Sequence, residues 1–385
     1  MSVLASIGKL EFALACGLPL TAWLCELAAG LGLAPQLACL REHDCPWDNC
    51  TCAAAAGGGH LGVLKWARTN GCSWSKKTCE AAAERAHLPV LKWARMNGCP
   101  WDWVTSYMAA GKGHLEVLQW VHANGCGTAN TCSAAASGGH LEVLQWARAN
   151  GFEWHWATCS KAADGGHLAL LQWARANGCE WNEQACASAA YGGHLPALQW
   201  LRDNGCPWCQ LTTQSAAEGG KLAVLQWARA NGCEWGAGVC WLAALGGHLE
   251  ILLWAHANGC PWDARTTEAA GIGCHLALLT WARANGCPWD RGMCTASALC
   301  GQLGVLQWAR ANGCEWDEAL TLRAAVRGAH LSVVRWARLN GCGWGPLSCA
   351  RARELIEEEE LDEEDPLGRF FFFFFSYPKN DGSDS

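Results

Sequence analysis

The stretch His140–Gly151 reads HLEVLQWARANG, and closely similar stretches recur along almost the whole of the 385-residue chain. Twelve copies fill residues 21 to about 350, and successive copies are 27 residues apart, with one unit of 26 and one of 28. The first copy begins at Leu33 and is degenerate, because Cys39 stands where later copies carry tryptophan. The others begin at His60, His87, His114, His140, His167, His194, Lys221, His248, His275, Gln302 and His330. A fixed period of this length indicates a repeat architecture.

Each copy is interpreted as two helices. The segment Thr131–Ala136 starts with a residue type that is common at helix N-caps and continues with small helix-forming residues. Two glycines then interrupt the pattern. From Leu141 onward the apolar residues form the stripe of an amphipathic helix, and Asn150-Gly151 is typical of a helix end. The predicted unit is helix, tight turn, helix and short loop.

One such unit is too small to bury a core of its own, so neighbouring units must stack. The sequence therefore predicts an all-α repeat solenoid of about twelve short helix-turn-helix units, in which the first and last copies act as caps. We expect three regions, namely an N-terminal segment over 1–20, the repeats over 21–350 and a tail over 351–385. The tail holds an acidic block at 357–365 and six consecutive phenylalanines at 370–375, and we expect it to be disordered.

At residues 139–151 the string GHLEVLQWARANG resembles the second helix of ankyrin repeats, and Thr131–Ala136 resembles the start of their first helix. The resemblance runs in register over about 330 residues. It implies an ankyrin-type solenoid that binds other proteins. A departure is the length, because ankyrin units have about 33 residues. The missing residues fall between Trp-Asp and the next Thr, so we expect the projecting hairpins of the family to be reduced to tight loops.

The charge pattern separates a neutral body from an acidic tail. Residues 351–385 hold eleven acidic and four basic side chains, which leaves 24 of each sign in residues 1–350. A neutral body lacks the clustered positive charge that binding to a phosphate backbone needs, so no nucleic-acid partner is expected. No apolar stretch is long enough to span a bilayer, and no membrane partner is expected. With 26 cysteines in a regular array, reduced thiols in an intracellular, cytoplasmic or nuclear compartment are favoured.

The regularly spaced histidines and cysteines could be interpreted as metal or redox sites. For the histidines we favour a structural role, in which each caps a turn and hydrogen-bonds to the adjacent unit, because Lys221 and Gln302 replace histidine in two copies. For the cysteines we favour packing, because Phe152, Thr213 and Leu322 take cysteine positions without disturbing the repeat. The isolated Cys206-Pro-Trp-Cys209 is interpreted as a chance feature of a variable loop. No metal and no cofactor are therefore expected.

Two rows of tryptophan and one of arginine follow the same period. The helix tryptophans run from Trp66 to Trp336, the loop tryptophans run from Trp47 to Trp344, and both rows are interpreted as core. We interpret the arginine row as a solvated stripe paired with Glu and Asp, or else as a docking strip for an acidic partner. The row comprises Arg68, Arg95, Arg148, Arg175, Arg202, Arg229, Arg283, Arg310 and Arg338, with His122 and His256 in the gaps.

Specificity is expected where the copies differ, since exposed positions can vary without disturbing the core. The candidate partner-binding residues are Trp103, Trp156, Trp241, Lys76, Lys77, His155, Gln210, Arg265, Arg291 and Glu318. No nucleophile–base pair, phosphate-binding loop or carboxylate pair lies outside the repeat pattern, so no enzyme is expected. We predict a monomeric scaffold or adaptor that binds another protein. The alternatives are a substrate adaptor of a ubiquitin ligase, a nucleic-acid binder that uses the arginine edge, and a thiol-rich metal buffer.

Overall fold

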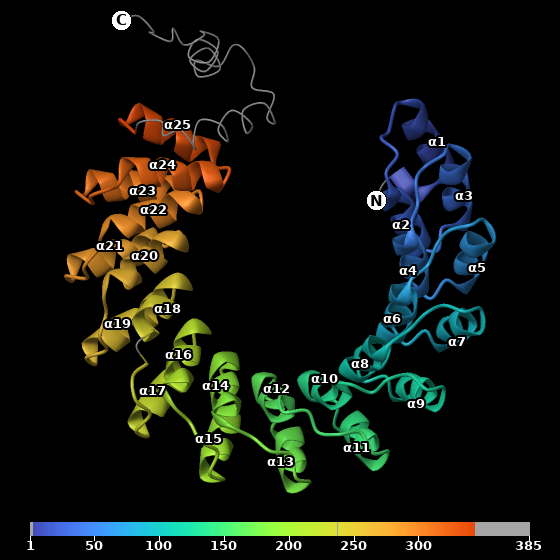
Figure 1. The fold of residues 1–385 in the computed structure, drawn as a ribbon, viewed down its shortest axis with the longest axis horizontal. Helices are drawn as coiled ribbons and strands as arrows, with labels where there is room; N and C mark the ends of the chain where they lie inside the picture. Colours follow the sequence, from blue (N-terminus) through green and yellow to red (C-terminus); the bar gives the residue numbers. More distant parts are fainter. Residues whose placement is uncertain (1–2, 237, 343–385) are drawn as a thin grey trace, which may run out of the picture. The chain divides into compact units, whose positions relative to one another are not determined.

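The computed structural model describes residues 3–236 and 238–342 (Figure 1). The predictions about the tail over 351–385, Trp344 and Cys349 lie outside the described residues. Within the described part every regular element is a helix, as the sequence predicts, and none is a strand. No described helix is long and apolar enough to cross a membrane.

The repeats give twelve helix pairs in the described part of the chain, and in each pair a first helix is followed by a second helix. The first helices are α2 (Ala22–Gly30), α4 (Asn49–Gly57), α6 (Lys76–Glu84), α8 (Trp103–Gly111), α10 (Thr131–Gly138), α12 (Thr158–Asp164), α14 (Glu183–Gly192), α16 (Gln210–Glu218), α18 (Val239–Leu245), α20 (Ala264–Ile272), α22 (Arg291–Leu299) and α24 (Glu318–Arg327). The second helices are α3 (Ala34–Glu42), α5 (Leu61–Thr69), α7 (Leu88–Met96), α9 (Leu115–Ala123), α11 (Leu141–Ala149), α13 (Leu168–Ala176), α15 (Leu195–Asp203), α17 (Leu222–Ala230), α19 (Leu249–Ala257), α21 (Leu276–Ala284), α23 (Leu303–Ala311) and α25 (Leu331–Leu339).

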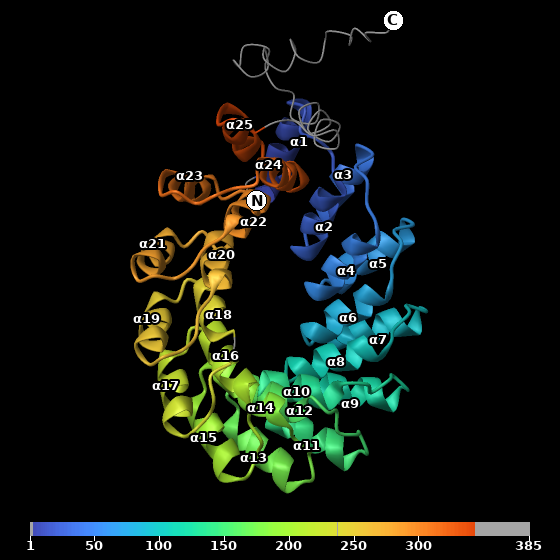
Figure 2. The ribbon, with the colours of Figure 1, turned by 60° about the vertical axis from the view of Figure 1, so that its left-hand side comes forward.

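Contacts divide the chain into two units, one ending at Trp208 and one beginning at Cys209. In each unit the first helices pack directly on one another, whereas the second helices pack mainly on the first helix of their own repeat. Figures 1 and 2 show the resulting two rows of helices. This arrangement confirms that stacked neighbours, and not single repeats, supply the core.

An N-terminal helix precedes the repeats. The 3₁₀ turn η1 (Val3–Ala5) leads into α1 (Ile7–Ala15), whose N-cap Ser6 accepts a hydrogen bond from the backbone N–H of Lys9 at 3.3 Å. Helix α1 packs on α3, and its Leu10 is fully buried. The Gln36 side chain of α3 donates to the Leu4 carbonyl at 3.3 Å. The segment therefore covers the apolar end of the first repeat, as a cap does.

Small residues on the first helices explain why these helices lie close together. In α4, Thr51, Cys52, Ala55 and Ala56 are buried, and the equivalent residues recur in later copies. The second helix adds two large apolar residues and an alanine, which are Val143, Leu144 and Ala147 in α11. The leucine at the Leu144 position is fully buried in repeat after repeat, at Leu64, Leu91, Leu118, Leu144, Leu171, Leu198, Leu225, Leu252, Leu279 and Leu306.

The second helix ends as predicted at Asn-Gly. Gly151 has a φ of +82°, the left-handed conformation that favours glycine, and Asn150 donates its side-chain amide to the Trp146 carbonyl at 2.8 Å. Irregular chain then leads to the next first helix without a strand in the described loops. This confirms the prediction that short loops stand where longer repeats carry hairpins.

Candidate functional site

The two helices of each repeat create two different edges in the array. At one edge, which we call the loop edge, a second helix ends and the loop runs to the N-terminus of the next first helix. At the other edge, the first helix turns through glycines and histidine into the second. The loop edge carries two sets of residues, an almost invariant one on the second helix and loop, and a variable one at the start of the first helix.

Within each unit, the almost invariant set is a repeating series of tryptophan and arginine side chains. Arg68 of α5 places its guanidinium carbon 4.2 Å from the ring centre of the loop residue Trp74, and Trp74 packs edge-on against Trp93 of α7 with ring centres 5.9 Å apart. We call this set the Trp–Arg ladder. The arginine–tryptophan distances in it range from 3.9 to 4.6 Å. The tryptophan pairs have ring centres 5.6 to 6.1 Å apart.

The ladder corrects the prediction that the framework tryptophans are core. Trp66, Trp146, Trp173 and the other described members of both rows are half-buried and not buried. The physical reason is the splay of the second helices, which leaves a wedge between neighbours. The loop indole fills this wedge, with one face against arginine and its edge against the next tryptophan.

The ladder arginines from Arg41 to Arg310 form no ion pair with a carboxylate among the described residues, which corrects the interpretation of a stripe paired with Glu and Asp. Instead, Nη1 of Arg95 donates to the Cys99 carbonyl at 2.6 Å, and Arg283 and Arg310 bind the equivalent carbonyls at 2.6 and 2.7 Å. The ion pairs between described residues involve Lys76, Lys112 and Arg265, and none of these pairs includes an arginine of the ladder from Arg41 to Arg310. A guanidinium has five N–H donors, so most remain available at the half-exposed ladder positions.

Two exceptions show how closely the ladder geometry is kept. In one, His256 replaces arginine and stacks on Trp262 with ring centres 3.9 Å apart. In the other, the loop at Gly127 lacks its tryptophan, and Phe152 contacts both His122 and Trp146 at 4.9 and 5.6 Å. Phe152 therefore fills the place of the missing indole and is not merely a neutral substitution for cysteine.

Sequence reasoning missed one ladder member, Arg41 of the degenerate first copy. Its guanidinium carbon lies 4.4 Å from the ring centre of Trp47. The signal was present, because Arg41 precedes Trp47 by six residues, as Arg68 precedes Trp74. The loss of the helix tryptophan at Cys39 concealed the register.

The variable set lies one to three residues beyond the loop tryptophan. We call it the variable strip, and the structure places nine of the ten candidate binding residues in it, at or just before the first turn of a first helix. These nine are Lys76, Lys77, Trp103, His155, Trp156, Gln210, Arg265, Arg291 and Glu318. Trp156 is 74% exposed and Trp103 is 39% exposed.

Trp241 does not belong to this strip. It lies in the middle of α18 and is half-buried, and a side chain built at Gly238 would meet its indole nitrogen at 2.8 Å. The expectation of an exposed aromatic at this position is therefore wrong. A glycine one turn earlier leaves room for the indole to fold back onto its own helix.

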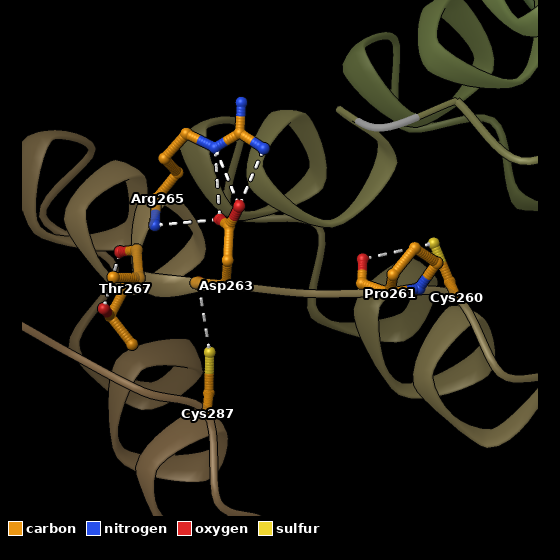
Figure 3. A network of polar contacts seen from close by, with 7 residues as sticks. Cys260, Pro261, Asp263, Arg265, Thr267 and Cys287 are labelled. Carbon is orange, nitrogen blue, oxygen red and sulfur yellow. Dashed lines mark hydrogen bonds and ion pairs between the residues drawn. The ribbon is translucent and has the colours of Figure 1, made fainter.

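Acidic N-caps lie between the ladder and the variable strip. The Asp102 carboxylate accepts the backbone N–H of Val104 at 2.9 Å and binds Lys76 of the preceding repeat at 2.7 Å. The hydrogen bond from Lys76 and its charge lower the pKa of Asp102. Figure 3 shows the same role for Asp263, which accepts from Arg265 and whose backbone carbonyl accepts from the Cys287 thiol.

At the opposite edge the histidines join consecutive repeats, as predicted. His114 Nε2 lies 2.9 Å from the Glu84 carbonyl of the preceding repeat, and His275 lies 3.0 Å from the Leu245 carbonyl. Gln302 makes the same bond to Ile272 at 3.3 Å, which confirms that glutamine can take this role. Positive-φ glycines make room for the rings: a Cβ on Gly113 would lie 2.5 Å from the His140 ring.

His140 gives this edge a testable pH dependence. Burial lowers its pKa below the ordinary 6.5, and the nearby His114 and His167 lower it further. The unfolded state then binds more protons, so stability is lost as pH falls from about 7 to about 5. We expect His140→Gln, which reproduces the hydrogen-bonding role of Gln302, to flatten this loss in urea melts at the two pH values. Parallel losses in the wild type and the variant would contradict the assignment.

The cysteines are free thiols in the described part of the chain, and most are buried. Among the described residues no group of three or more His, Cys, Asp or Glu side chains is placed to hold a metal ion. Cys206 is buried and donates to the Asn182 carbonyl at 3.4 Å, whereas Cys209 is exposed.

No family model matches the chain, and no curated protein matches it in sequence. Among solved structures, the chain is similar to the pentatricopeptide repeat protein PPR10 in complex with an 18-nt psaJ RNA element, at 13% identity and a TM-score of 0.37. A cysteine-to-serine variant of that complex gives the same values. Both matches cover 91% of this chain and 64% of the other, so this chain spans less than two thirds of the length of PPR10. The PPR10 structure from maize matches at 14% identity and a TM-score of 0.32, covering 96% and 76% of the two chains.

These findings correct the sequence-based assignment. The ankyrin assignment is wrong, since no family model matches and these solved structures are pentatricopeptide repeat proteins. Two of these structures hold RNA. This finding also corrects the prediction of a protein-binding scaffold or adaptor and the prediction that no nucleic acid is a partner. The physical reason is that the shared pattern of His, Gly and Ala serves tight turns and close helix packing. Any short two-helix repeat needs such residues.

Proposed function

We propose that the repeat array binds single-stranded RNA along its loop edge. The observation behind this proposal is the row of ladder arginines from Arg41 to Arg310, which are held on tryptophan faces and have no carboxylate within ion-pair distance in the described part of the chain. A cationic track interleaved with aromatic rings is the combination with which proteins bind single strands. Sequence-specific recognition of RNA also targets single-stranded regions, whose bases are unpaired.

The Trp–Arg ladder supplies the contacts to the phosphates. Each guanidinium is fixed in position by its indole and by the carbonyl that accepts from Nη1, as Arg95 is by Trp101 and Cys99. Its remaining donors suit the planar, two-point binding of a phosphate. Because the array provides one such group in nearly every repeat, the strand is followed without regard to sequence.

The variable strip supplies the contacts to the bases. In the loop before α4, Asn49 lies two positions after Trp47, so their Cα atoms lie within about 7 Å of each other. A strand bound on the ladder thus places its bases within reach of the variable strip. Trp103 and Trp156 offer stacking surfaces, while Gln210 and Arg291 offer hydrogen-bond donors for base edges. One base per repeat is the natural register for such an arrangement.

The neutral charge of residues 1–350 does not oppose this function. Net charge sums every face, whereas binding depends on the local arrangement. The acidic N-caps are engaged by backbone N–H groups, as Asp48 is by Cys50 at 2.8 Å, or by a lysine, as Asp102 is. None of these acidic side chains forms an ion pair with a ladder arginine from Arg41 to Arg310 among the described residues.

Photocrosslinking tests where the strand lies. The full chain would be mixed with a pool of unstructured single-stranded RNA, irradiated and digested, and the crosslinked peptides would be identified by mass spectrometry. We expect the crosslinks to fall in the loops and first turns of the loop edge, such as residues 99–104 and 152–157. Crosslinks confined to the glycine–histidine turns, or no crosslinks above those given by an RNA duplex, would overturn the proposal.

A further inference from the structure

The buried cysteines are arranged in pairs within single repeats. One member lies on the first helix and the other follows the second helix, 20 residues later. In the pair Cys159–Cys179 the two Sγ atoms are 3.0 Å apart. In the other six pairs of the described part of the chain, hydrogen bonding between the partner cysteines shifts the pKa of their thiols. The seven pairs are Cys25–Cys45, Cys52–Cys72, Cys79–Cys99, Cys159–Cys179, Cys186–Cys206, Cys240–Cys260 and Cys294–Cys314.

In five of the seven pairs the loop thiol also donates to the backbone carbonyl of the N-cap residue of its own first helix. Cys72 donates to the Asp48 carbonyl at 3.2 Å and Cys99 donates to the Ser75 carbonyl at 3.5 Å, so the loop sulfur is held over the N-cap of its own first helix. The helix cysteine lies one turn further along that helix. The folded repeat therefore brings the two sulfurs together without help from the neighbouring repeats.

The surroundings restrict what these pairs can do. Both cysteines of each pair are buried. The exposed fractions are 0% for Cys159 and 1% for Cys179, and 1% for Cys240 and 4% for Cys260. Burial prevents the pairs from bridging to another molecule. A zinc site would need further ligands, and no group of three metal-binding side chains exists among the described residues.

We propose that the seven pairs are oxidation sites, each of which closes to a disulfide that ties a first helix to the loop at the end of its own repeat. The oxidant is a small peroxide that can reach a buried site during local opening. One thiolate attacks the peroxide, which forms a sulfenic acid and releases one molecule of water or hydroxide. The second sulfur then attacks the sulfenic sulfur, the S–S bond forms, and the second oxygen leaves as water. Two thiols lose two electrons and two protons, and the peroxide accepts both.

The two thiols of a pair are not equivalent, which suits this sequence of steps. In Cys52–Cys72 the hydrogen bond from the helix thiol lowers the pKa of Cys72 and raises that of Cys52, while burial opposes the change at Cys72. A lowered pKa favours the thiolate, which is the species that attacks the peroxide. In Cys159–Cys179 the hydrogen bond between the thiols lowers the pKa of the helix cysteine and raises that of the loop cysteine.

Some repeats lack one of the two cysteines, and their remaining buried cysteines serve as internal controls for disulfide formation. Cys126 and Cys287 occupy the loop position, but the residues 20 positions earlier are Ser106 and Thr267. Cys132 occupies the helix position, but the residue 20 positions later is Phe152. These cysteines are as buried as the paired ones and should form no disulfide.

Mapping of disulfides in the folded chain tests this inference. The reduced full chain would be treated with hydrogen peroxide, its free thiols blocked by alkylation, and its peptides analysed by mass spectrometry. We expect links between residues 20 apart in the seven pairs, alkylated thiols at Cys126, Cys132 and Cys287, and reversal by dithiothreitol. A higher melting temperature of the oxidised chain is also expected, because each link closes a loop within one repeat. Paired cysteines that stay reduced while the exposed Cys16 is oxidised, or links that ignore the 20-residue spacing, would overturn the inference.

A single substitution tests whether each disulfide forms only within its own pair. Cys159→Ser should remove only the link to Cys179, which then becomes open to alkylation in the unfolded peptide, while the other six links persist. Serine already occupies this helix position at Ser106, where it is buried, so the variant is expected to fold. If Cys179 instead forms a link with another cysteine in the folded variant, the pairs are not the unit of oxidation.

Discussion

Leu171→Ala lowers the free energy of unfolding by roughly 3–5 kcal/mol, the largest loss that we expect from a single substitution. Leu171 is fully buried in α13, between the first and second helices of its repeat. Truncation removes apolar contacts and leaves a cavity that the close-packed alanines of the first helices cannot fill. A urea melt followed by circular dichroism measures the loss.

Two tryptophans of the same repeat are the matched controls. Trp173 lies on the same helix but is half-buried in the ladder, so Trp173→Ala should cost about 2–3 kcal/mol. Trp156 is 74% exposed, so Trp156→Ala should lower the free energy of unfolding by less than about 1 kcal/mol. If Trp173→Ala is as costly as Leu171→Ala, then the ladder is part of the core and our description of the loop edge is wrong.

Arg175→Glu combined with Arg202→Glu weakens the binding of single-stranded RNA by at least about a hundredfold. Both guanidiniums lie 4.3 Å from the ring centre of their loop tryptophan, and both belong to the same unit. Charged hydrogen bonds of this kind contribute about 1.5–3 kcal/mol each, and 1.4 kcal/mol corresponds to a tenfold change in affinity. Fluorescence anisotropy of a labelled RNA measures the change.

The control removes the same charge from the opposite edge. Arg85 is exposed at the end of α6, and Lys112 at the end of α8 pairs with Glu84 at 3.5 Å. The double change Arg85→Glu with Lys112→Glu should alter the affinity by less than a factor of about ten, since these residues lie away from the ladder. Equal losses from the two variants would mean that general charge, and not the ladder, attracts the strand.

The sequence predicts the scaffold well because packing repeats with the period. The 27-residue spacing, the Asn-Gly helix end and the Gly-His turn each have one local physical cause, and all of them recur in the structure. The role of histidine could even be predicted from the substitution at Gln302. These features depend on residues within one repeat or its neighbour, which sequence spacing reports directly.

The loop edge is harder to predict because its contacts cross between repeats. Indole counts as apolar, which favours a core position for Trp74, whereas the splay of α5 and α7 leaves it half-exposed under Arg68. The charges in the sequence suggest that carboxylates are the partners of the arginines. They do not reveal that each ladder arginine packs on the face of a tryptophan six residues later. The thiol pairs are visible as a 20-residue spacing, but only the fold shows that their sulfurs meet.

The salt dependence of RNA binding tests the central claim most directly. For a strand held by ladder arginines, the logarithm of the affinity falls linearly with the logarithm of salt concentration, with a slope of about −0.7 per phosphate contacted. We predict a steep slope for the full chain, reduced by about 1.4 in the variant with Arg175→Glu and Arg202→Glu, and unchanged in the Arg85 and Lys112 control. A salt-independent affinity, or a slope that the ladder substitutions leave unchanged, would contradict the account.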